Sequence, residues 1–235
     1  MDNSATELAA TSIAAREPGI PGYMHEVYHW AYINTRNAWL LDRELIVNSI
    51  LWGNSATLRR AVTGEIEPAS RVFHAAHVYG EMLPDLARKI GPGGQLDMVD
   101  VVPLQVELAR RKLREFPYAQ VQLADAAQRD DNRYQAVVSY FLLHEIPDDY
   151  KHAVVAALLE RVQEGGRAVF VDYHQPRRWH PLGPLMQLVF RTLEPFALSL
   201  TRTEIRDYAS RSDAFQWSKQ TFFGGLYQKV VAIRG

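Results

Sequence analysis

Four side chains at predicted strand ends have the chemistry of a metal or acid–base site. His144 and Glu145 follow the fourth predicted strand of the chain. Asp172 ends the fifth predicted strand, and His174 comes directly after it. If these strands are parallel neighbours, the loops that follow them meet at one edge of the sheet. Two imidazoles and two carboxylates suit a divalent ion such as Mn²⁺, and an imidazole alone suits proton transfer. We therefore predict that these four residues are both the catalytic group and the metal ligands.

Each of these residues also has a structural interpretation. His144 could order its own loop through an N–H···O hydrogen bond, and Glu145 could be a solvated loop acid. Asp172 could cap the end of its strand. His174 and His180 flank a proline-rich bend, where structural roles fit equally well. The residue types alone leave both interpretations open.

A second group of residues suggests a nucleotide site. The segment 74–80 follows the first predicted strand, and a dinucleotide loop would carry three glycines at alternate positions of it. Ala76, Val78 and Gly80 occupy these positions, so one glycine remains. Asp100 ends the second predicted strand, about 20 residues after Gly80. An acid that binds ribose hydroxyls has this spacing from the glycine loop. Asp125 closes the third strand, where a carboxylate can accept a hydrogen bond from an adenine amino group.

The tyrosines near these loops are a third kind of candidate. Their rings can form the wall of a nucleotide site or stack on an aromatic substrate. Ordinary packing in the core is an equally good interpretation of them. Together with the loop and the strand ends, they complete the predicted set of cofactor-binding residues. This set is Tyr28, Tyr32, His74, Ala76, His77, Tyr79, Gly80, Asp100, Val101, Asp125, Ala126 and Tyr140.

The elements that must position these residues alternate along the chain between short apolar runs and helical periodicity. This alternation is typical of parallel βαβ units with helices on both faces of the sheet. Strands are predicted at 71–76, 95–100, 121–124, 136–140 and 168–172, with helices at 84–90, 104–114 and 150–162. Two more strands, at 215–222 and 226–233, complete the sheet, one of them antiparallel. The prediction is an α/β fold, a doubly wound, mostly parallel, seven-stranded Rossmann-like sheet.

The ends of the chain and a late insertion are predicted to be helical. Residues 1–22 are polar and predicted to be flexible, and 23–66 to form an N-terminal helical cap of two helices that break near 34–35. The remaining part, 67–235, is predicted to be one domain that includes a helical segment at 177–212, before the last strands.

Composition limits the function further. The chain has 235 residues, 26 Lys and Arg against 27 Asp and Glu, and no cysteine. The formal net charge of −1 argues against a nucleic-acid binder. Without cysteine, disulfides, thiolate-bound zinc and thiol nucleophiles are excluded. We find no apolar run of membrane-spanning length and no signal-peptide pattern, and therefore expect a cytoplasmic protein.

From the first predicted strand to Asp172, the pattern resembles the class I S-adenosylmethionine-dependent methyltransferases. The residues that carry the resemblance are the loop 74–80, the glycine turn at 91–94, Asp100, Asp125 and the segment 142–148, which is similar to that of quinone-biosynthesis methyltransferases. The resemblance implies S-adenosylmethionine as cofactor. His74 stands where an acid commonly meets the methionine ammonium, which leads to the hypothesis that this amino group is held differently here; the alternative is a buried structural histidine.

The flanking segments resemble the rhodoquinone biosynthesis methyltransferase-like family more closely, over residues 23–235. The segments that carry this resemblance are 28–32, 41–43, 50–54, 76–80, 171–174, 179–182, 193–196 and 223–229. His77 departs from the small residue or cysteine expected there. The resemblance implies that ubiquinone is the substrate and that an amino group from S-adenosylmethionine replaces a ring methoxy group, assisted by manganese. The alternative is a conventional methyltransferase that acts on a quinone or a small aromatic ring. A third hypothesis is a protein that binds S-adenosylmethionine without catalysing a reaction.

If the substrate is a lipid, one more segment has a candidate function. Residues 179–200 combine apolar side chains with flanking arginines, a composition that suits peripheral contact with a membrane surface such as the inner membrane. The alternative is a helix that covers the site of a protein with no membrane contact. The sequence assigns no oligomeric state.

Overall fold

The computed structural model describes residues 42–235. The predicted flexible segment 1–22, the first predicted cap helix, and the candidates Tyr28 and Tyr32 lie outside the described residues. In the part that the structure describes, no helix combines the length and the apolar character that crossing a membrane requires.

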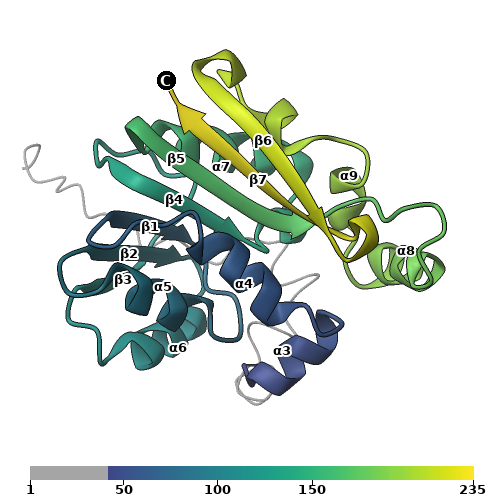
Figure 1. Ribbon diagram of the computed structural model, residues 1–235, viewed down its shortest axis with the longest axis horizontal. Helices are drawn as coiled ribbons and strands as arrows, with labels where there is room; N and C mark the ends of the chain where they lie inside the picture. The colour runs from purple at the N-terminus through teal and green to yellow at the C-terminus, as the bar shows by residue number, and fades with distance from the viewer. Residues whose placement is uncertain (1–41) are drawn as a thin grey trace, which may run out of the picture.

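A seven-stranded sheet forms the centre of the described chain (Figure 1). Its strand order is β3-β2-β1-β4-β5-β7-β6. All pairings among the first five strands are parallel, whereas β7 runs antiparallel to both β5 and β6. The bounds are β1 Arg71–Ala75, β2 Gln95–Asp100, β3 Ala119–Leu123, β4 Tyr134–Tyr140, β5 Val162–Tyr173, β6 Phe215–Phe222 and β7 Tyr227–Arg234. The predicted fold class is confirmed.

Helices cover both faces of the sheet, as strands that are buried on both sides require. The helix α5 contacts both α4 and α6, and these three helices share one hydrophobic cluster with the sheet, whereas α7 packs into a second cluster. The bounds are α3 Glu44–Ile50, α4 Ser55–Thr63, α5 Met82–Ile90, α6 Pro103–Leu113, α7 Asp148–Glu160, α8 Gly183–Thr192 and α9 Ala197–Leu200. Short 3₁₀ turns complete the described elements: η2 Leu143–Glu145, η3 Ile205–Tyr208, η4 Ser212–Ala214 and η5 Phe223–Gly225.

The late helical segment lies near the carboxyl end of β5 (Figure 1). Residues 183–192 form α8 as the apolar periodicity predicts, and α9 is a short helix that follows Pro195. Within the predicted helical segment 177–212, Ile205–Tyr208 form the 3₁₀ turn η3. Since α8 and α9 come directly after the strand that carries Asp172, they sit where they can border a site at this edge.

The boundary between α7 and β5 differs from the sequence prediction for a physical reason. The predicted helix 150–162 ends at Glu160, and Val162 already pairs with Tyr134 as the start of β5. Gly165 and Gly166 therefore lie inside an irregularity of β5. Gly165 has a φ of +72°, and a Cβ on Gly166 would be 2.9 Å from a backbone oxygen of Gln135, so both positions require glycine. In the described part of the predicted cap, the chain breaks between α3 and α4.

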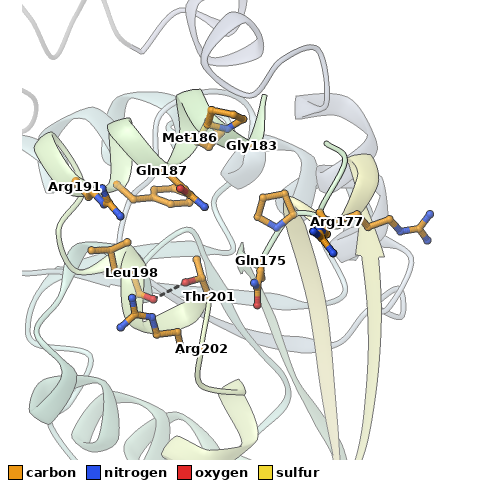
Figure 2. Close-up of a pocket in the computed structure, with 13 residues that line it drawn as sticks. Gln175, Arg177, Gly183, Met186, Gln187, Arg191, Leu198, Thr201 and Arg202 are labelled. Carbon is orange, nitrogen blue, oxygen red and sulfur yellow. Dashed lines mark hydrogen bonds between the residues drawn. The ribbon is translucent and has the colours of Figure 1, made fainter. Parts of the chain in front are cut away.

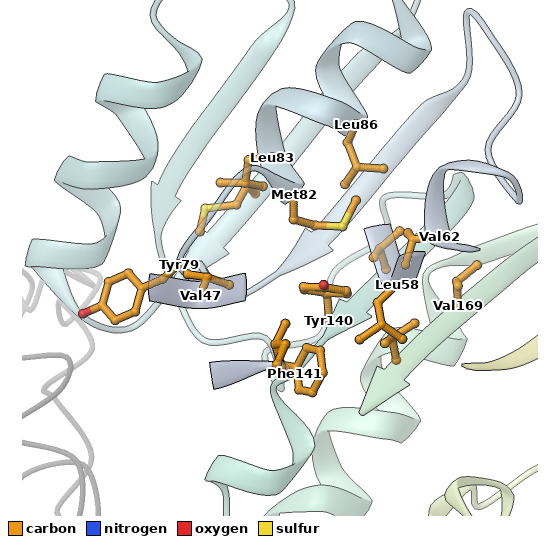
Figure 3. Close-up of a cluster of buried hydrophobic side chains, with 14 of the residues drawn as sticks. Val47, Leu58, Val62, Tyr79, Met82, Leu83, Leu86, Tyr140, Phe141 and Val169 are labelled. Atoms are coloured by element: carbon orange, nitrogen blue, oxygen red, sulfur yellow. The ribbon is translucent and has the colours of Figure 1, made fainter. Parts of the chain in front are cut away.

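The helices α3 and α4 pack against the same core as the sheet. Val47 of α3, together with Leu58 and Val62 of α4, belongs to the hydrophobic cluster that includes Val169 of β5 (Figure 3). These contacts do not by themselves show that α3 and α4 belong to a separate cap. The predicted boundary between a cap at 23–66 and a domain at 67–235 therefore stays a prediction.

Candidate functional site

A cavity opens at the carboxyl ends of β1, β2 and β3, the edge at which open parallel sheets bind ligands. Six of the predicted cofactor-binding residues line it: Ala76, His77, Asp100, Val101, Asp125 and Ala126. The predicted catalytic residue Glu145 also lines it. The other lining residues are Val102, Gln105, Ala124, Leu142, Ile146, Tyr150 and Val154. Residues from three separate strand ends are thus brought to one cavity, with apolar walls supplied by α7 and the loop after β4.

Asp100 joins the loops after β1 and β2 within this cavity. Its Oδ2 accepts a hydrogen bond from the backbone N–H of His77 at 2.7 Å, and its Oδ1 accepts one from the N–H of Val102 at 2.8 Å. Burial raises the pKa of this carboxyl to about 6, although the backbone N–H groups oppose the shift. Each oxygen keeps a further lone pair, so the carboxylate can still accept hydrogen bonds from a ligand.

Asp125 has a comparable position at the end of β3. Its Oδ1 accepts a hydrogen bond from the N–H of Ala127 at 2.8 Å, and its Oδ2 accepts one from the Tyr150 hydroxyl. Tyr150 comes from the first turn of α7 and lines the cavity. The contact therefore fixes the carboxylate between β3 and α7.

A short chain of hydrogen bonds orients His77. The amide nitrogen of Gln105 donates to the Tyr79 hydroxyl at 3.0 Å, which leaves the amide oxygen 2.7 Å from Nδ1 of His77. In this arrangement Nδ1 carries the proton and Nε2 has a free lone pair. Nε2 is buried and has no hydrogen-bond partner among residues 42–235. Burial, the largest cause, lowers the pKa of His77 to about 3, so this imidazole is a neutral acceptor at the cavity.

The loop after β1 keeps left-handed backbone positions although Gly80 is the one glycine that remains of the three. Ala76 has a φ of +64°, a left-handed conformation that costs a residue with a Cβ about 1–2 kcal/mol. Its N–H donates to the Val99 carbonyl at 2.9 Å. The Val78 side chain packs against the hydrophobic cluster and does not line the cavity. The branched carbon at this position is therefore accommodated by the core.

Four other predicted cofactor-binding residues are not among the lining residues of the cavity. Tyr79 contacts two of the lining residues, because its hydroxyl accepts a hydrogen bond from Gln105 and its ring centroid lies 6.0 Å from that of His77. The N–H of Gly80 donates to Asp42 at 3.2 Å, and its carbonyl accepts from Lys112. His74 and Tyr140 are completely or nearly completely buried.

Of these four, two are core residues. Neither ring nitrogen of His74 has a hydrogen-bond partner within the described chain, and burial lowers its pKa to about 4. The Tyr140 ring packs with Leu58 and Met82 in the hydrophobic cluster (Figure 3).

Asp172 and His144 form a buried pair beside the cavity. The His144 Nδ1 lies 2.9 Å from Oδ1 of Asp172. The same carboxylate accepts hydrogen bonds from the backbone N–H groups of Leu143 at 2.9 Å and of Tyr173 at 2.8 Å. Although burial opposes it, the charge of Asp172 and its hydrogen bond raise the pKa of His144 to about 9. The imidazole is therefore a cation near neutral pH.

Two further carboxylates face the other ring nitrogen. The His144 Nε2 lies 3.8 Å from Glu145 and 4.0 Å from Glu194. Glu194 follows α8, so the helical segment contributes an acid to the site. Glu145 lines the cavity and approaches His144, and it thereby links the two parts of the site.

The structure does not bring His174 to this group. Its Nδ1 lies 2.9 Å from the Gly225 carbonyl, and its Nε2 lies 3.4 Å from the ammonium of Lys219. Within residues 42–235, no group of three or more His, Asp or Glu side chains is arranged to hold a metal ion. The predicted manganese site therefore lacks support.

The types of residue that line the cavity suit a nucleoside cofactor. The carboxylates of Asp100 and Asp125 line it, and side chains such as Leu142 and Ile146 add apolar surface, a combination that suits a ribose and an adenine ring. The Nε2 of His77, which is buried and has no hydrogen-bond partner in the part of the chain that the structure describes, adds an acceptor for a ligand N–H or O–H donor. Asp100 would hold the ribose hydroxyls, and Asp125 the adenine amino group.

Known proteins that resemble this chain agree with this geometry. Residues 72–166 match the family model of a methyltransferase domain. This segment runs from β1 into β5 and contains the whole cavity wall.

A curated relative is the ubiquinone/menaquinone biosynthesis C-methyltransferase UbiE of Teredinibacter turnerae, 25% identical over 140 residues. The alignment covers 56% of this chain and 55% of that protein. A Pseudomonas putida protein of the same description is 24% identical over 139 residues. The chain therefore spans about half the length of the curated relatives that it matches.

Solved methyltransferases share the fold over most of the chain. An O-methyltransferase family protein from Burkholderia thailandensis superposes with a TM-score of 0.64 at 14% identity, covering 87% of this chain and 64% of that one. Human N-acetylserotonin methyltransferase, in complex with S-adenosylmethionine, superposes with a TM-score of 0.59 at 16% identity. This superposition covers 92% of this chain and 60% of that one. The seven-stranded architecture is thus that of the methyltransferase fold.

Three contributors to the site were missed by the sequence analysis. Gln105 is a polar residue on the buried face of α6, and that exception to the apolar pattern was a usable signal. Tyr150 belongs to a helix that was predicted to begin at that residue but begins two residues earlier, at Asp148. Glu194 reaches His144 only through the path of α8, for which the local sequence has no signal.

Proposed function

We propose that the chain is an S-adenosylmethionine-dependent methyltransferase that acts on a quinone or a related aromatic ring. The observation that carries the proposal is the convergence of Ala76, Asp100 and Asp125, from three strand ends, on one cavity beside the buried His144. The match to a methyltransferase domain supports the reaction class, and the quinone-biosynthesis relatives support the substrate class.

The residues of the cavity divide the work of holding the cofactor. Asp100 accepts hydrogen bonds from the two ribose hydroxyls, and Asp125 accepts one from the adenine amino group. The walls around Leu142 exclude water from the ring faces. When bound, S-adenosylmethionine would supply an activated methyl group.

The adjacent residues act on the acceptor. Held as a cation by Asp172, the His144 imidazolium stabilises negative charge on a ring oxygen, since a charge-assisted hydrogen bond is strong in a buried site. Glu145 lies between the cavity and this imidazolium and is positioned to receive a proton from the acceptor. In this proposal Asp172 is a positioning residue, because it acts through His144.

One observation favours a second candidate, the amino transfer of the rhodoquinone biosynthesis family. The first loop position is His74, which is buried and neutral, so it cannot provide the anionic anchor that an acid gives to the methionine ammonium. This amino group would then need another partner. The flanking segments that resemble the rhodoquinone family add support from the sequence. The comparisons favour methyl transfer, and it remains the first proposal.

Two measurements test the function. Isothermal titration calorimetry should detect S-adenosylmethionine binding to the wild-type chain. Binding should be weakened in Asp100→Asn and Asp125→Asn but not in Asp131→Asn, a matched control on the surface. Mass spectrometry after incubation with S-adenosylmethionine and ubiquinone or a hydroquinone lacking a ring methyl group identifies the reaction.

The products separate the candidates. A methylated ring together with S-adenosylhomocysteine supports the first proposal, and an aminoquinone supports the second. Cofactor binding with no product in either assay would contradict both and leave a binding protein. No cofactor binding would remove the basis of all three.

A further inference from the structure

The segment between β5 and β6 presents a surface that the proposed reaction does not use. We call it the arginine–leucine face. It consists of Arg177, Arg178, Trp179, Leu185, Leu188, Arg191, Leu193 and Arg202. Trp179 is 87% exposed and Leu188 is 58% exposed. Large apolar side chains that gather on one exposed face usually mark an interaction site.

A cavity of about 560 Å³ lies within this face, between α8, α9 and the loop after β5 (Figure 2). Arg191 and Arg202 lie on one side of it, with Leu198 between them, and Arg177 lies on the opposite side (Figure 2). Arg178 also lines the cavity, while its guanidinium lies over the Trp179 ring at 5.4 Å. Guanidinium groups around an open cavity are suited to phosphate oxygens.

The charge of this face is not neutralised by the described chain. None of the four arginines forms an ion pair with a carboxylate among residues 42–235. Glu194 is the one acid between Arg177 and Arg202 in the sequence, and it approaches His144 instead. Elsewhere many surface arginines, such as Arg88 and Arg111, have an acidic partner. The face therefore attracts an anionic partner.

The arrangement of α8 limits what that partner can be. Met186 and Phe190 form its buried side, and Gln187 and Arg191 point to the cavity, whereas Leu185 and Leu188 lie on the exposed side. A small phosphate compound would account for the arginines but would leave these leucines and Trp179 in water. A bilayer surface accounts for both, because lipid phosphates lie directly above an apolar layer.

We propose that the arginine–leucine face docks on the surface of an anionic phospholipid bilayer. Lipid phosphates contact the arginines at the mouth of the cavity. Trp179, Leu185 and Leu188 enter the boundary between headgroups and acyl chains, where tryptophan is favoured. The contact is peripheral, and it does not depend on which reaction the chain catalyses.

Docking at this face would keep the candidate site close to the bilayer. Phe190, on the buried side of α8, packs against Tyr173 with ring centroids 5.0 Å apart, and Tyr173 packs against His144 at 4.9 Å. Two aromatic side chains, Phe190 and Tyr173, therefore lie between the backbone of α8 and His144. A lipid substrate that leaves the bilayer would have a short path to this pair.

Co-sedimentation of the full chain with vesicles tests the proposal. Binding is measured with neutral phosphatidylcholine vesicles and with vesicles in which phosphatidylglycerol, the anionic probe, makes up about 30 mol% of the lipid. The chain should bind the anionic vesicles, and high salt should weaken the binding because it screens charge. The double variant Arg178→Gln with Arg191→Gln should lose roughly tenfold or more of the partition coefficient. The double variant Trp179→Ser with Leu188→Gln should lose a similar amount.

Matched variants away from the face are the controls. Arg88→Gln with Arg111→Gln removes the same charge from exposed arginines of other helices, and Leu45→Gln removes a leucine that is 81% exposed. Both should bind as the wild type does, and circular dichroism should show that all variants are folded. Equal losses in the control and test variants would overturn the proposal, as would absence of binding to anionic vesicles.

A second arm separates a bilayer from a free anion. Inorganic phosphate is titrated calorimetrically into the chain without vesicles. If phosphate binds through Arg178 and Arg191 while vesicles do not bind, the cavity is a site for a soluble phosphate and the membrane proposal is wrong. Equal binding to neutral and anionic vesicles would contradict the role of the arginines.

Discussion

Asp172 holds His144 from two sides at once. One carboxylate oxygen lies 2.9 Å from the ring Nδ1, and the other accepts hydrogen bonds from the backbone N–H groups of Leu143 and His144 at 2.9 and 3.3 Å. A single side chain at the end of β5 thereby fixes both the ring and the 3₁₀ turn that carries it. With Asp172 1% exposed, the two charges of the pair stabilise each other away from water.

Replacing Asp172 by Asn should lower both the pKa of His144 and the stability of the fold. The folded-state pKa of about 9 lies above the value of about 6.5 in an unfolded chain. Below pH 6.5 the pair therefore contributes its full stabilisation, and the contribution is lost as the pH rises through 9. Urea unfolding of the wild type should show a free energy of unfolding that falls over this interval.

In Asp172→Asn, the free energy of unfolding should change less with pH over this interval. It should also be lower than in the wild type by about 3 kcal/mol at pH 6.5, because the substitution leaves a buried imidazole without its counter-charge. His174→Gln is the control, since His174 lies outside this pair, and it should keep the wild-type profile. An unchanged slope in Asp172→Asn would show that another group is responsible for the pH dependence.

Affinity for S-adenosylmethionine should depend on the ionisation of Asp100. Burial raises the pKa of this carboxyl to about 6, and ligand hydroxyls donate best to its ionised form. Calorimetric titrations should therefore show a dissociation constant that rises as the pH falls below 6, by roughly tenfold per pH unit at the limit. The wild-type affinity should be constant from pH 7 to 8.

The Asp100→Asn variant isolates this group. It should bind about 10- to 100-fold more weakly at pH 7.5, the range for a lost hydrogen bond to a charged group, and its affinity should no longer change between pH 5 and 7. Asp131→Asn removes an exposed carboxylate and should behave as the wild type does. If Asp100→Asn kept the pH dependence, Asp125 or Glu145 would be the next group to test.

His74 should destabilise the fold in mild acid. Burial lowers its pKa to about 4, so the folded chain keeps it neutral whereas an unfolded chain protonates it near pH 6.5. Its depressed pKa means that stability is present above pH 6.5 and is lost as the pH falls toward 4. His77, with a pKa lowered to about 3, adds to the same loss.

His74→Leu should reduce this acid sensitivity. The substitution also removes two buried ring nitrogens that have no partner within the described residues, and an unpaired buried polar group costs about 1–3 kcal/mol. Thermal unfolding at pH 5 should thus show a higher melting temperature than in the wild type, with His174→Leu as the matched control. A lower melting temperature at pH 5 would mean that the His74 ring makes an essential interaction.

The elements and the cavity were predictable to different degrees. Asp100 and Asp125 follow apolar runs, and because parallel strands end at one edge, the sequence alone placed them together. His174 lies two residues after Asp172, but the chain there continues to pair with β7 through the Leu226 carbonyl, which carries the His174 ring away from His144. Periodicity does not show such a change of direction.

Long-range side-chain partners were the least predictable part of the site. Glu194 approaches His144 because the path of α8 and α9 returns it to the end of β5, and no local pattern records that path. His77 could be identified as a loop residue, whereas its tautomer depends on Gln105 of α6. Contacts of this kind are set by tertiary packing and not by the spacing of residues in the chain.

Lys151 should be essential for holding Glu194 near the site. Its side chain is completely buried at the start of α7. The ammonium donates to Asp148 at 2.6 Å, to the Phe196 carbonyl at 2.8 Å and to the Ser199 hydroxyl at 2.7 Å. It thus fastens the start of α9, two residues after Glu194, to α7. Lys151→Met should cost about 2–3 kcal/mol, because the carbonyl and the hydroxyl lose a charged donor.

The same variant should change His144 as well. With α9 released, the Glu194 carboxylate no longer stays 4.0 Å from the ring, and the pKa of His144 should fall because one of the charges that raise it has moved away. NMR titration of the histidine ring measures this pKa, and urea unfolding measures the stability. Lys89→Met removes an exposed lysine from α5 and should change neither quantity. A loss of stability with an unchanged His144 pKa would mean that Lys151 supports the fold without positioning Glu194.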